Sequence, residues 1–111
     1  MHSDDSDASV IAGVKADAGK PRYDLLPWRA IEAVARVMTF GARKYSDDQW
    51  RRVPNARQRY FAAALRHLVA WYLGQPTDEE SGEPHLAHAA CCVLFLIEGD
   101  ETNVKGDVSC R

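Results

Sequence analysis

The sequence lacks the features that mark several large classes of protein. It has no apolar run near 18 residues and no signal-peptide pattern, so we expect neither a membrane span nor secretion. Only three of its 111 residues are cysteine, and the adjacent Cys91 and Cys92 are poorly placed for a disulfide framework. A Walker loop and a G-x-G-x-x-G pattern are also missing. These absences favour a small, soluble protein of a reducing, cytoplasmic compartment.

The net charge and the length of the chain exclude further classes of protein and define one expected domain. A net charge of -2 gives no basic excess, which argues against a dedicated nucleic-acid-binding protein. Residues 1–19 and 99–111 are polar without a sustained apolar period, so we expect a disordered N-terminal segment and a flexible C-terminal tail. The remaining domain, residues 20–98, is roughly 80 residues long, and a core of this size buries only a modest area. Because 46% of the chain is hydrophobic, we expect a homo-oligomer to supply further burial.

Three segments show apolar residues at helical spacing, and no segment alternates in the manner of a β-strand. Proline, glycine and the end of each apolar stripe set the expected boundaries. The sequence therefore predicts an all-α helical bundle that a partner chain completes. The expected helices start after Pro27 and end at Gly41, run from about 56 to 73 before Gly74, and run from near Pro84 to about 98.

An acidic turn precedes the third expected helix. Asp78, Glu79 and Glu80 are adjacent and would repel one another unless water or a cation neutralises them. The simpler interpretation is a capping box, because Thr77-x-x-Glu80 fits that pattern, or a solvated acidic loop. The functional interpretation is a binding site for a divalent metal ion, to which carboxylate oxygens are suited.

Histidines lie next to this turn. His85 and His88 are spaced i,i+3, so they face the same side of a helix and could share one ligand. His67 lies on the second expected helix, which the short connection should place antiparallel to the third. Hydrogen-bonded core histidines are the alternative, and a zinc site with Cys92 is a weaker one because no C-x-x-C pair accompanies it. Cys91, Cys92 and Phe95 are expected in the core.

Further candidates lie on and around the first helix. Glu32 is its only acidic residue, and it could pair with Arg36 at i+4 or reach a metal ion held by the acidic turn. Basic and aromatic side chains suit the phosphates and the base of a nucleotide, respectively, although solvated loop residues explain them equally well. These candidates for substrate binding are Lys20, Arg22, Lys44, Tyr45, Trp50, Arg66 and His67.

Several motifs in this order resemble one known family. They are Lys20-Pro-Arg-Tyr-Asp-Leu-Leu-Pro27, Phe40-Gly-Ala-Arg-Lys-Tyr45, Arg66-His67 and Asp78-x-Glu80-Ser-Gly-x-x-His85-Leu-Ala-His88. Together they resemble the phage dATP/dGTP pyrophosphohydrolases, MazG-like members of the all-α nucleoside triphosphate pyrophosphohydrolases. The similarity covers about residues 19–98. The motifs also resemble the MazZ-like branch of this family, which converts dGTP to dGMP for 2-aminoadenine nucleotide synthesis.

The resemblance implies a dimer or tetramer, Mg²⁺ or Mn²⁺ as cofactor, and attack of water on the α-phosphorus of a purine deoxynucleoside triphosphate with release of pyrophosphate. MazG-like proteins usually bind metal through an EExxE helix followed by an ExxD helix. This chain offers Arg66-His67-x-x-Ala70 and His85-Leu-Ala-His88 at those places, so its metal site must be rebuilt. We therefore assign Glu32 and Glu80 as catalytic residues, and the metal ligands as Glu32, Asp78, Glu80, His85 and His88.

Two other functions compete with this hypothesis. A helical, non-enzymatic phage regulator that binds nucleic acid would use the arginines at 51, 52, 57 and 59, and its affinity would fall steeply with salt. A histidine-rich phosphohydrolase of another type is the second rival, but the sequence has no adjacent His-Asp pair. Pyrophosphate as the product would exclude both.

Overall fold

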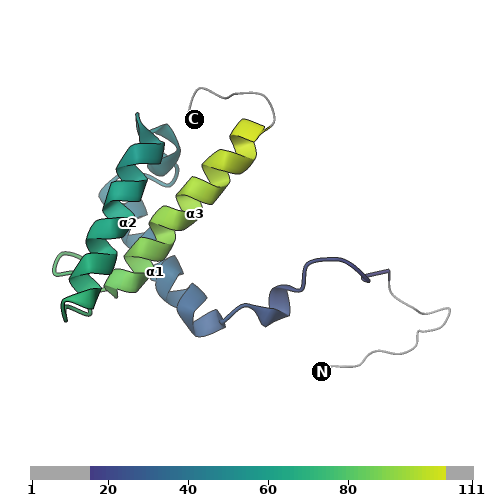
Figure 1. Cartoon of the computed structure of the whole chain (residues 1–111), viewed down its shortest axis with the longest axis horizontal. Coiled ribbons are helices and arrows are strands. Elements are labelled where there is room, and N and C mark those ends of the chain that lie inside the picture. The colour runs from purple at the N-terminus through teal and green to yellow at the C-terminus, as the bar shows by residue number, and fades with distance from the viewer. Residues whose placement is uncertain (1–15, 105–111) are drawn as a thin grey trace.

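The computed structural model describes residues 16–104, and all regular secondary structure in this range is helical (Figure 1). The one β-type pairing described there is an isolated bridge between Thr77 and Pro84. The all-α fold predicted from the sequence is therefore confirmed. Within the same range, no helix has the length and apolarity to cross a bilayer. The elements are η1 (Tyr23–Leu25), α1 (Trp28–Lys44), η2 (Gln49–Arg52), α2 (Ala56–Tyr72) and α3 (His85–Val104).

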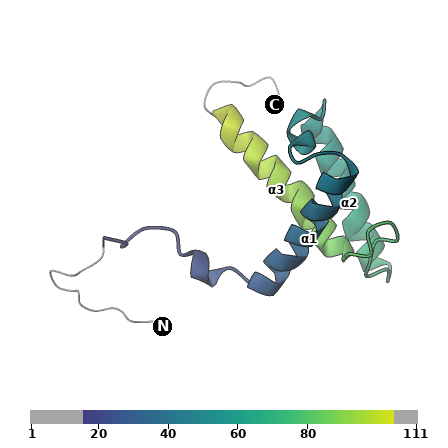
Figure 2. The same cartoon turned by 180° about the vertical axis from the view of Figure 1, so that it is seen from behind.

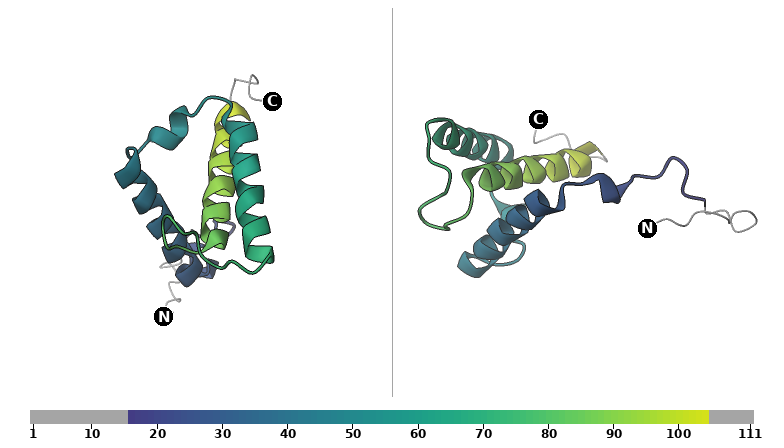
Figure 3. Two further views of the ribbon diagram at one scale, coloured as in Figure 1. Left: turned by 90° about the vertical axis from the view of Figure 1, so that its left-hand side faces the viewer. Right: turned by 90° about the horizontal axis from the view of Figure 1, so that it is seen from below.

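Helix α3 is the centre of the arrangement. Helix α2 lies along it in the antiparallel direction, and α1 packs against it at an angle (Figures 2 and 3). The contact between α1 and α3 buries Val34 and Val37 against Ala87 and Cys91. The Cys91 thiol also donates a hydrogen bond to the Val34 carbonyl oxygen at 3.6 Å. Small residues at 87 and 91 let the two helices approach closely, and Cys91 and Cys92 are buried as predicted.

Helix α1 begins where the sequence predicts but ends later. The Pro27 carbonyl accepts the first hydrogen bond of the helix, from the N–H of Ile31. The prediction that Gly41 ends the helix is wrong, because Gly41 keeps a helical backbone and the helix continues to Lys44. A helical glycine costs only about 1 kcal/mol relative to alanine. Arg43 and Lys44 interact favourably with the negative end of the helix dipole.

The two ends of the α2–α3 connection follow the prediction, whereas the end of α3 does not. Gly74, with φ 99°, closes α2, and α3 begins directly after Pro84. The expected end near 98 is wrong because α3 passes through Gly99 and reaches Val104. Gly99 has neither a left-handed backbone nor a proline after it to stop the helix. Of the two expected disordered ends, residues 1–15 and 105–111 lie outside the described range.

Apolar side chains remain exposed on two helix faces and on the segment before α1. The stripe on α2 is formed by Phe61, Leu65, Leu68 and Tyr72, whose 4-3-4 spacing places them on one face of the helix, next to the buried Ala64. The stripe on α3 is formed by Leu86, Val93 and Ile97. The segment before α1 leads away from the bundle (Figure 1), and its apolar residues are exposed. Those residues are Tyr23, Leu25 and Leu26.

Candidate functional site

The acidic turn has one defined conformation, which the Asp78 carboxylate organises. Its Oδ2 atom accepts hydrogen bonds from the backbone N–H groups of Glu80, at 3.1 Å, and Ser81, at 3.0 Å. The backbone of Asp78 bonds to Gly82 and Glu83, and Gly82 takes the left-handed conformation that the tight turn requires. Asp78 thus closes an Asx turn. Among the described residues no capping box forms between Thr77 and Glu80.

Two ion pairs hold this turn against α1. Lys44 Nζ lies 2.5 Å from Glu80 Oε2, and Arg36 Nε lies 2.8 Å from Glu83 Oε1. Because these pairs are largely exposed, each contributes little to the free energy of unfolding. Their effect is positional: they bring the acidic turn, which lies between α2 and α3, to the side of α1. The turn is therefore ordered and paired with α1, while Glu79 and Glu80 remain exposed to solvent.

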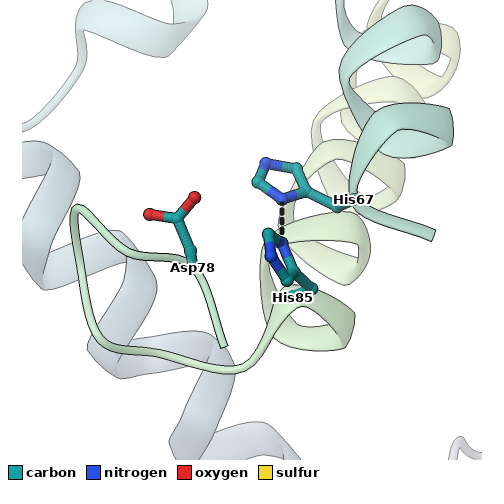
Figure 4. Close-up of side chains that lie close together, drawn as sticks. All are labelled: His67, Asp78 and His85. Atoms are coloured by element: carbon teal, nitrogen blue, oxygen red, sulfur yellow. Dashed lines mark hydrogen bonds between the residues drawn. The ribbon is translucent and has the colours of Figure 1, made fainter. Parts of the chain in front are cut away.

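Three histidines from two helices meet behind the turn. His67 Nδ1 on α2 lies 2.9 Å from His85 Nδ1 on α3, so one ring donates a hydrogen bond and the other accepts it (Figure 4). The His67 ring also stacks on His88, with centroids 4.6 Å apart and planes 13° from parallel. His88 Nε2 in turn lies 2.7 Å from Ser81 Oγ. The antiparallel placement of His67 beside the third helix, expected from the short connection, is confirmed.

Burial and neighbouring charges set the ionisation of this cluster. Burial lowers the pKa of His67 below 6.5, and the nearby His88 and His85 lower it further. Burial likewise lowers the pKa of His88, although Asp78 opposes that shift. Burial disfavours the charged form of Asp78, but the Ser81 N–H and His88 together hold its pKa below 3.8. At neutral pH the Asp78 carboxylate therefore lies beside the neutral rings of His67 and His88.

These shifts predict that the folded protein loses stability in mild acid. The pKa values of His67 and His88 are lower in the folded state than 6.5, so the unfolded chain binds more protons below that pH. The free energy of unfolding should be highest above pH 6.5 and fall as the pH drops through the folded-state pKa values. Thermal unfolding followed by circular dichroism in a metal-free buffer measures this. A Tm that stays level or rises between about pH 7 and pH 5 would contradict it, and His67→Gln should flatten the dependence.

The acidic turn also borders an open pocket of about 530 Å³. The pocket is shallow and opens widely to solvent. The side chains that line it are those of Gln75, Asp78, Glu79, Glu80 and His85.

The structure also places the remaining candidates from α1 and the basic loops. Glu32 is exposed one helical turn before Arg36 and raises the pKa of that guanidinium after the larger effect of Glu83. Among the described contacts none joins Glu32 to the acidic turn, and its assignment as ligand and catalyst remains a prediction. Lys44, expected at a phosphate, contacts Glu80 and lies over the Tyr45 ring at 5.3 Å.

The other candidates lie outside the histidine cluster. Lys20 and Arg22 belong to the exposed segment before α1, where Arg22 pairs with Asp24 at 2.7 Å. Trp50 stacks on Phe95, with centroids 4.4 Å apart. Phe95 follows His85 by ten residues, a distance of about 15 Å along a helix. Trp50 therefore packs in the fold at a different level of α3 from the histidines, and its role beside a base remains a prediction.

Sequence reasoning missed three residues of this site. Ser81 bonds to His88, Glu83 pairs with Arg36, and Gln75 lines the pocket. The Asp78-x-x-Ser81-Gly82 pattern carried a signal for the first of them, because a short polar side chain ahead of glycine is typical of Asx turns. Glu83 gave no such signal, since its partner is far away in sequence.

The arginines proposed for nucleic-acid binding are partly engaged within the fold. Arg51 lies over the Trp50 ring at 4.2 Å and contacts Asp48 and Glu98. Arg59 donates a hydrogen bond to the Pro54 carbonyl at 3.5 Å. These contacts give two of the four arginines a role in holding the η2 region, so they do not strengthen the regulator hypothesis.

The donor atoms decide which metal ions suit this site. Mg²⁺ demands oxygen ligands, so the two imidazole nitrogens of His67 and His85 do not fit it. The carboxylates of the acidic turn do fit, because Mg²⁺ bound to a triphosphate needs only one or two protein carboxylates. Asp78 and Glu80, which border the same open pocket, can supply them.

Comparisons with known proteins agree with the sequence motifs. The sequence model of the family described as "dATP/dGTP diphosphohydrolase, N-terminal" matches residues 11–108. A protein of Salmonella phage PMBT28 named dATP/dGTP diphosphohydrolase is 34% identical over 86 residues, which is 78% of this chain and 29% of that protein. The chain therefore spans less than a third of the length of this relative. No solved structure gives a significant match.

Proposed function

The chain belongs to the dATP/dGTP diphosphohydrolase family, whose N-terminal domain it matches, and on this premise we propose that it hydrolyses a purine deoxynucleoside triphosphate to the monophosphate and pyrophosphate. One structural observation supports the proposal most directly. The acidic turn is preorganised by Asp78 and paired with α1, and its carboxylates line an open, solvent-accessible depression. Preorganised charge of this kind is what phosphoryl-transfer chemistry needs from a protein.

The proposed roles follow from the charges around the pocket. Asp78 and Glu80, with Glu32 from α1, would hold Mg²⁺ or Mn²⁺ that arrives with the triphosphate. When bound, these ions supply positive charge that neutralises phosphate oxygens and makes nearby water more acidic. Glu80 or Glu32 would accept the proton of the water that attacks the α-phosphorus. The α-phosphorus–oxygen bond to the β-phosphate then breaks, and pyrophosphate leaves.

The basic residues would bind the triphosphate group of the substrate. Lys44 already lies at the acidic turn, so exchange of its partner from Glu80 to a phosphate requires only a side-chain movement. Arg66 is exposed on α2 next to His67 and could reach the same pocket. Lys20 and Arg22 could contribute only if the segment before α1 moves or comes from another subunit.

The finer proposal for the substrate is dGTP. It is based on the resemblance of the motifs to the MazZ-like branch, in which dGMP feeds 2-aminoadenine nucleotide synthesis. The name of the phage relative includes both dATP and dGTP. A host-cell cytoplasm is the corresponding location if a phage encodes the protein.

A homo-oligomer is also part of the proposal. The exposed stripes on α2 and α3 leave Leu65, Val93 and Ile97 between 44% and 52% accessible to solvent. Contiguous apolar stripes of this kind mark interaction surfaces. Because the α2 stripe has coiled-coil spacing, a second copy could pack helix against helix and complete a bundle.

A product assay tests the activity. The purified chain is incubated with each of the four dNTPs and Mg²⁺ or Mn²⁺, and nucleotides and pyrophosphate are measured, with a chelated sample as control. We expect metal-dependent dGMP with equimolar pyrophosphate, and a lower yield of dAMP. Turnover of no nucleotide at high enzyme concentration would overturn the proposed activity. Release of inorganic triphosphate would instead indicate another reaction class.

A further inference from the structure

Three ligand atoms from three consecutive segments converge at one point of the site. His67 comes from α2, Asp78 from the connecting turn and His85 from the first residue of α3 (Figure 4). One nitrogen or oxygen of each residue lies within 4.8 Å of the others. His85 is buried, and the other two side chains are half-buried, so water competes poorly for these atoms. We call this group the His-His-Asp triad.

We propose that the His-His-Asp triad binds one divalent transition-metal ion of the imidazole-preferring type, such as Co²⁺ or Zn²⁺, in addition to the Mg²⁺ or Mn²⁺ of the triphosphate, with the Asp78 carboxylate common to both sites. Any role of this ion in catalysis rests on the proposed function. The binding itself does not depend on that function.

The distance between the two rings supports this inference. Two nitrogens that each lie about 2.1 Å from one tetrahedral ion are about 3.4 Å apart. The two Nδ1 atoms are separated by 2.9 Å, so the rings need to open by only about 0.5 Å to admit an ion. In the hydrogen bond that joins them, a single proton lies between two lone-pair-bearing nitrogens. A metal ion can replace that proton and use both lone pairs.

Asp78 can supply the third ligand with little rearrangement. Its ligand atom and those of the two histidines lie within 4.8 Å of one another, so a side-chain movement on the order of 1 Å would bring the carboxylate to the spacing of a tetrahedral site. Oδ2 is occupied by the N–H groups of Glu80 and Ser81. The Oδ1 atom makes no hydrogen bond among the described residues, and a carboxylate can bind a cation through this second oxygen.

The neighbouring residues act as supports for the triad. His88 stacks on His67 and is held by Ser81, which fixes the plane of the His67 ring. Such outer contacts orient metal ligands in known sites. Two neutral nitrogens with one carboxylate favour borderline ions over Mg²⁺, since imidazole prefers zinc and its neighbours in the first row. The ion would thereby fix the acidic turn against both helices.

Cobalt absorption tests the proposal without nucleotide. The full chain is stripped with chelator, and Co²⁺ is added at neutral pH while the visible d–d absorption is recorded. We expect saturation at one ion per chain, loss of the signal on addition of Zn²⁺, and no loss in excess Mg²⁺. His67→Gln and Asp78→Asn should each weaken Co²⁺ binding by at least about tenfold. Circular dichroism checks that both variants keep their helices.

A matched control excludes adventitious binding. His2→Gln removes the one histidine outside the described residues and should leave the Co²⁺ affinity unchanged. If Co²⁺ binds but His67→Gln has no effect, or if His2→Gln abolishes the signal, the triad is only a structural hydrogen-bond cluster. Saturable absorption without dNTP turnover would uphold this site and overturn the proposed activity. Turnover of dNTP with Mg²⁺ but without Co²⁺ absorption would uphold the proposed activity and overturn this metal site.

Discussion

Replacing Asp78 by asparagine is expected to lower kcat for triphosphate hydrolysis by about 10²-fold or more, an increase of ~2.7 kcal/mol or more in the activation barrier. The substitution removes the negative charge that the proposed metal ions need. It keeps an oxygen that can accept the N–H groups of Glu80 and Ser81, so the turn should retain its shape. Steady-state kinetics with dGTP and Mg²⁺ measure the effect, and the Tm reports on folding.

The matched control for this variant is Asp100→Asn. Asp100 is an exposed carboxylate on α3, and its replacement changes the net charge by the same amount. We expect its kcat to match that of the wild type. If Asp78→Asn also stays within a few-fold of the wild type, Asp78 has no part in the reaction. If both variants lose activity to the same extent, the change in net charge of the protein causes the loss.

Replacing Leu65 by glutamate should convert the proposed homo-oligomer to a monomer. Leu65 lies at the centre of the α2 stripe and is 44% exposed in the isolated chain. In an interface that covers this stripe, the new carboxylate would be buried without a partner, at a cost of several kcal/mol. Size-exclusion chromatography with light scattering measures the mass of each species.

The control for that prediction is Thr39→Glu, which adds the same charge at an exposed position of α1. It should leave the mass of the wild-type assembly unchanged. A wild-type chain that is monomeric at high concentration would refute the homo-oligomer. An oligomer that survives Leu65→Glu would instead move the interface away from the α2 stripe.

The fold was predictable where local signals act alone. Apolar periodicity located all three helices, and Gly74 stopped α2 because it adopts the left-handed backbone that glycine permits. Gly41 and Gly99 present the same residue type inside helices, where the flanking residues decide the outcome. The residue type alone does not distinguish a glycine that ends a helix from a glycine that lies inside one. The end predicted at Gly41 and the end predicted at about residue 98 were consequently both too early.

The sequence was sufficient to predict which residues of the site lie near one another, but not which of their atoms are in contact. The antiparallel connection of α2 and α3 indicated that His67 and His85 would be near each other, but it could not show that their Nδ1 atoms face each other. That detail depends on side-chain rotamers. The partners of Glu80 and Glu83 depend on how α1 crosses α3, and this crossing is set by Val34, Val37, Ala87 and Cys91 together. No local pattern encodes such a contact.

The triad and its supports occupy one uninterrupted stretch of chain, from His67 to His88. Bringing together groups so near in sequence requires closure of a short loop only, which costs little chain entropy and favours rapid assembly. Helix α1 joins this hairpin through a small apolar contact and two ion pairs to the acidic turn. The histidine cluster is therefore a property of a single helical hairpin. The position of α1 can vary without dismantling it.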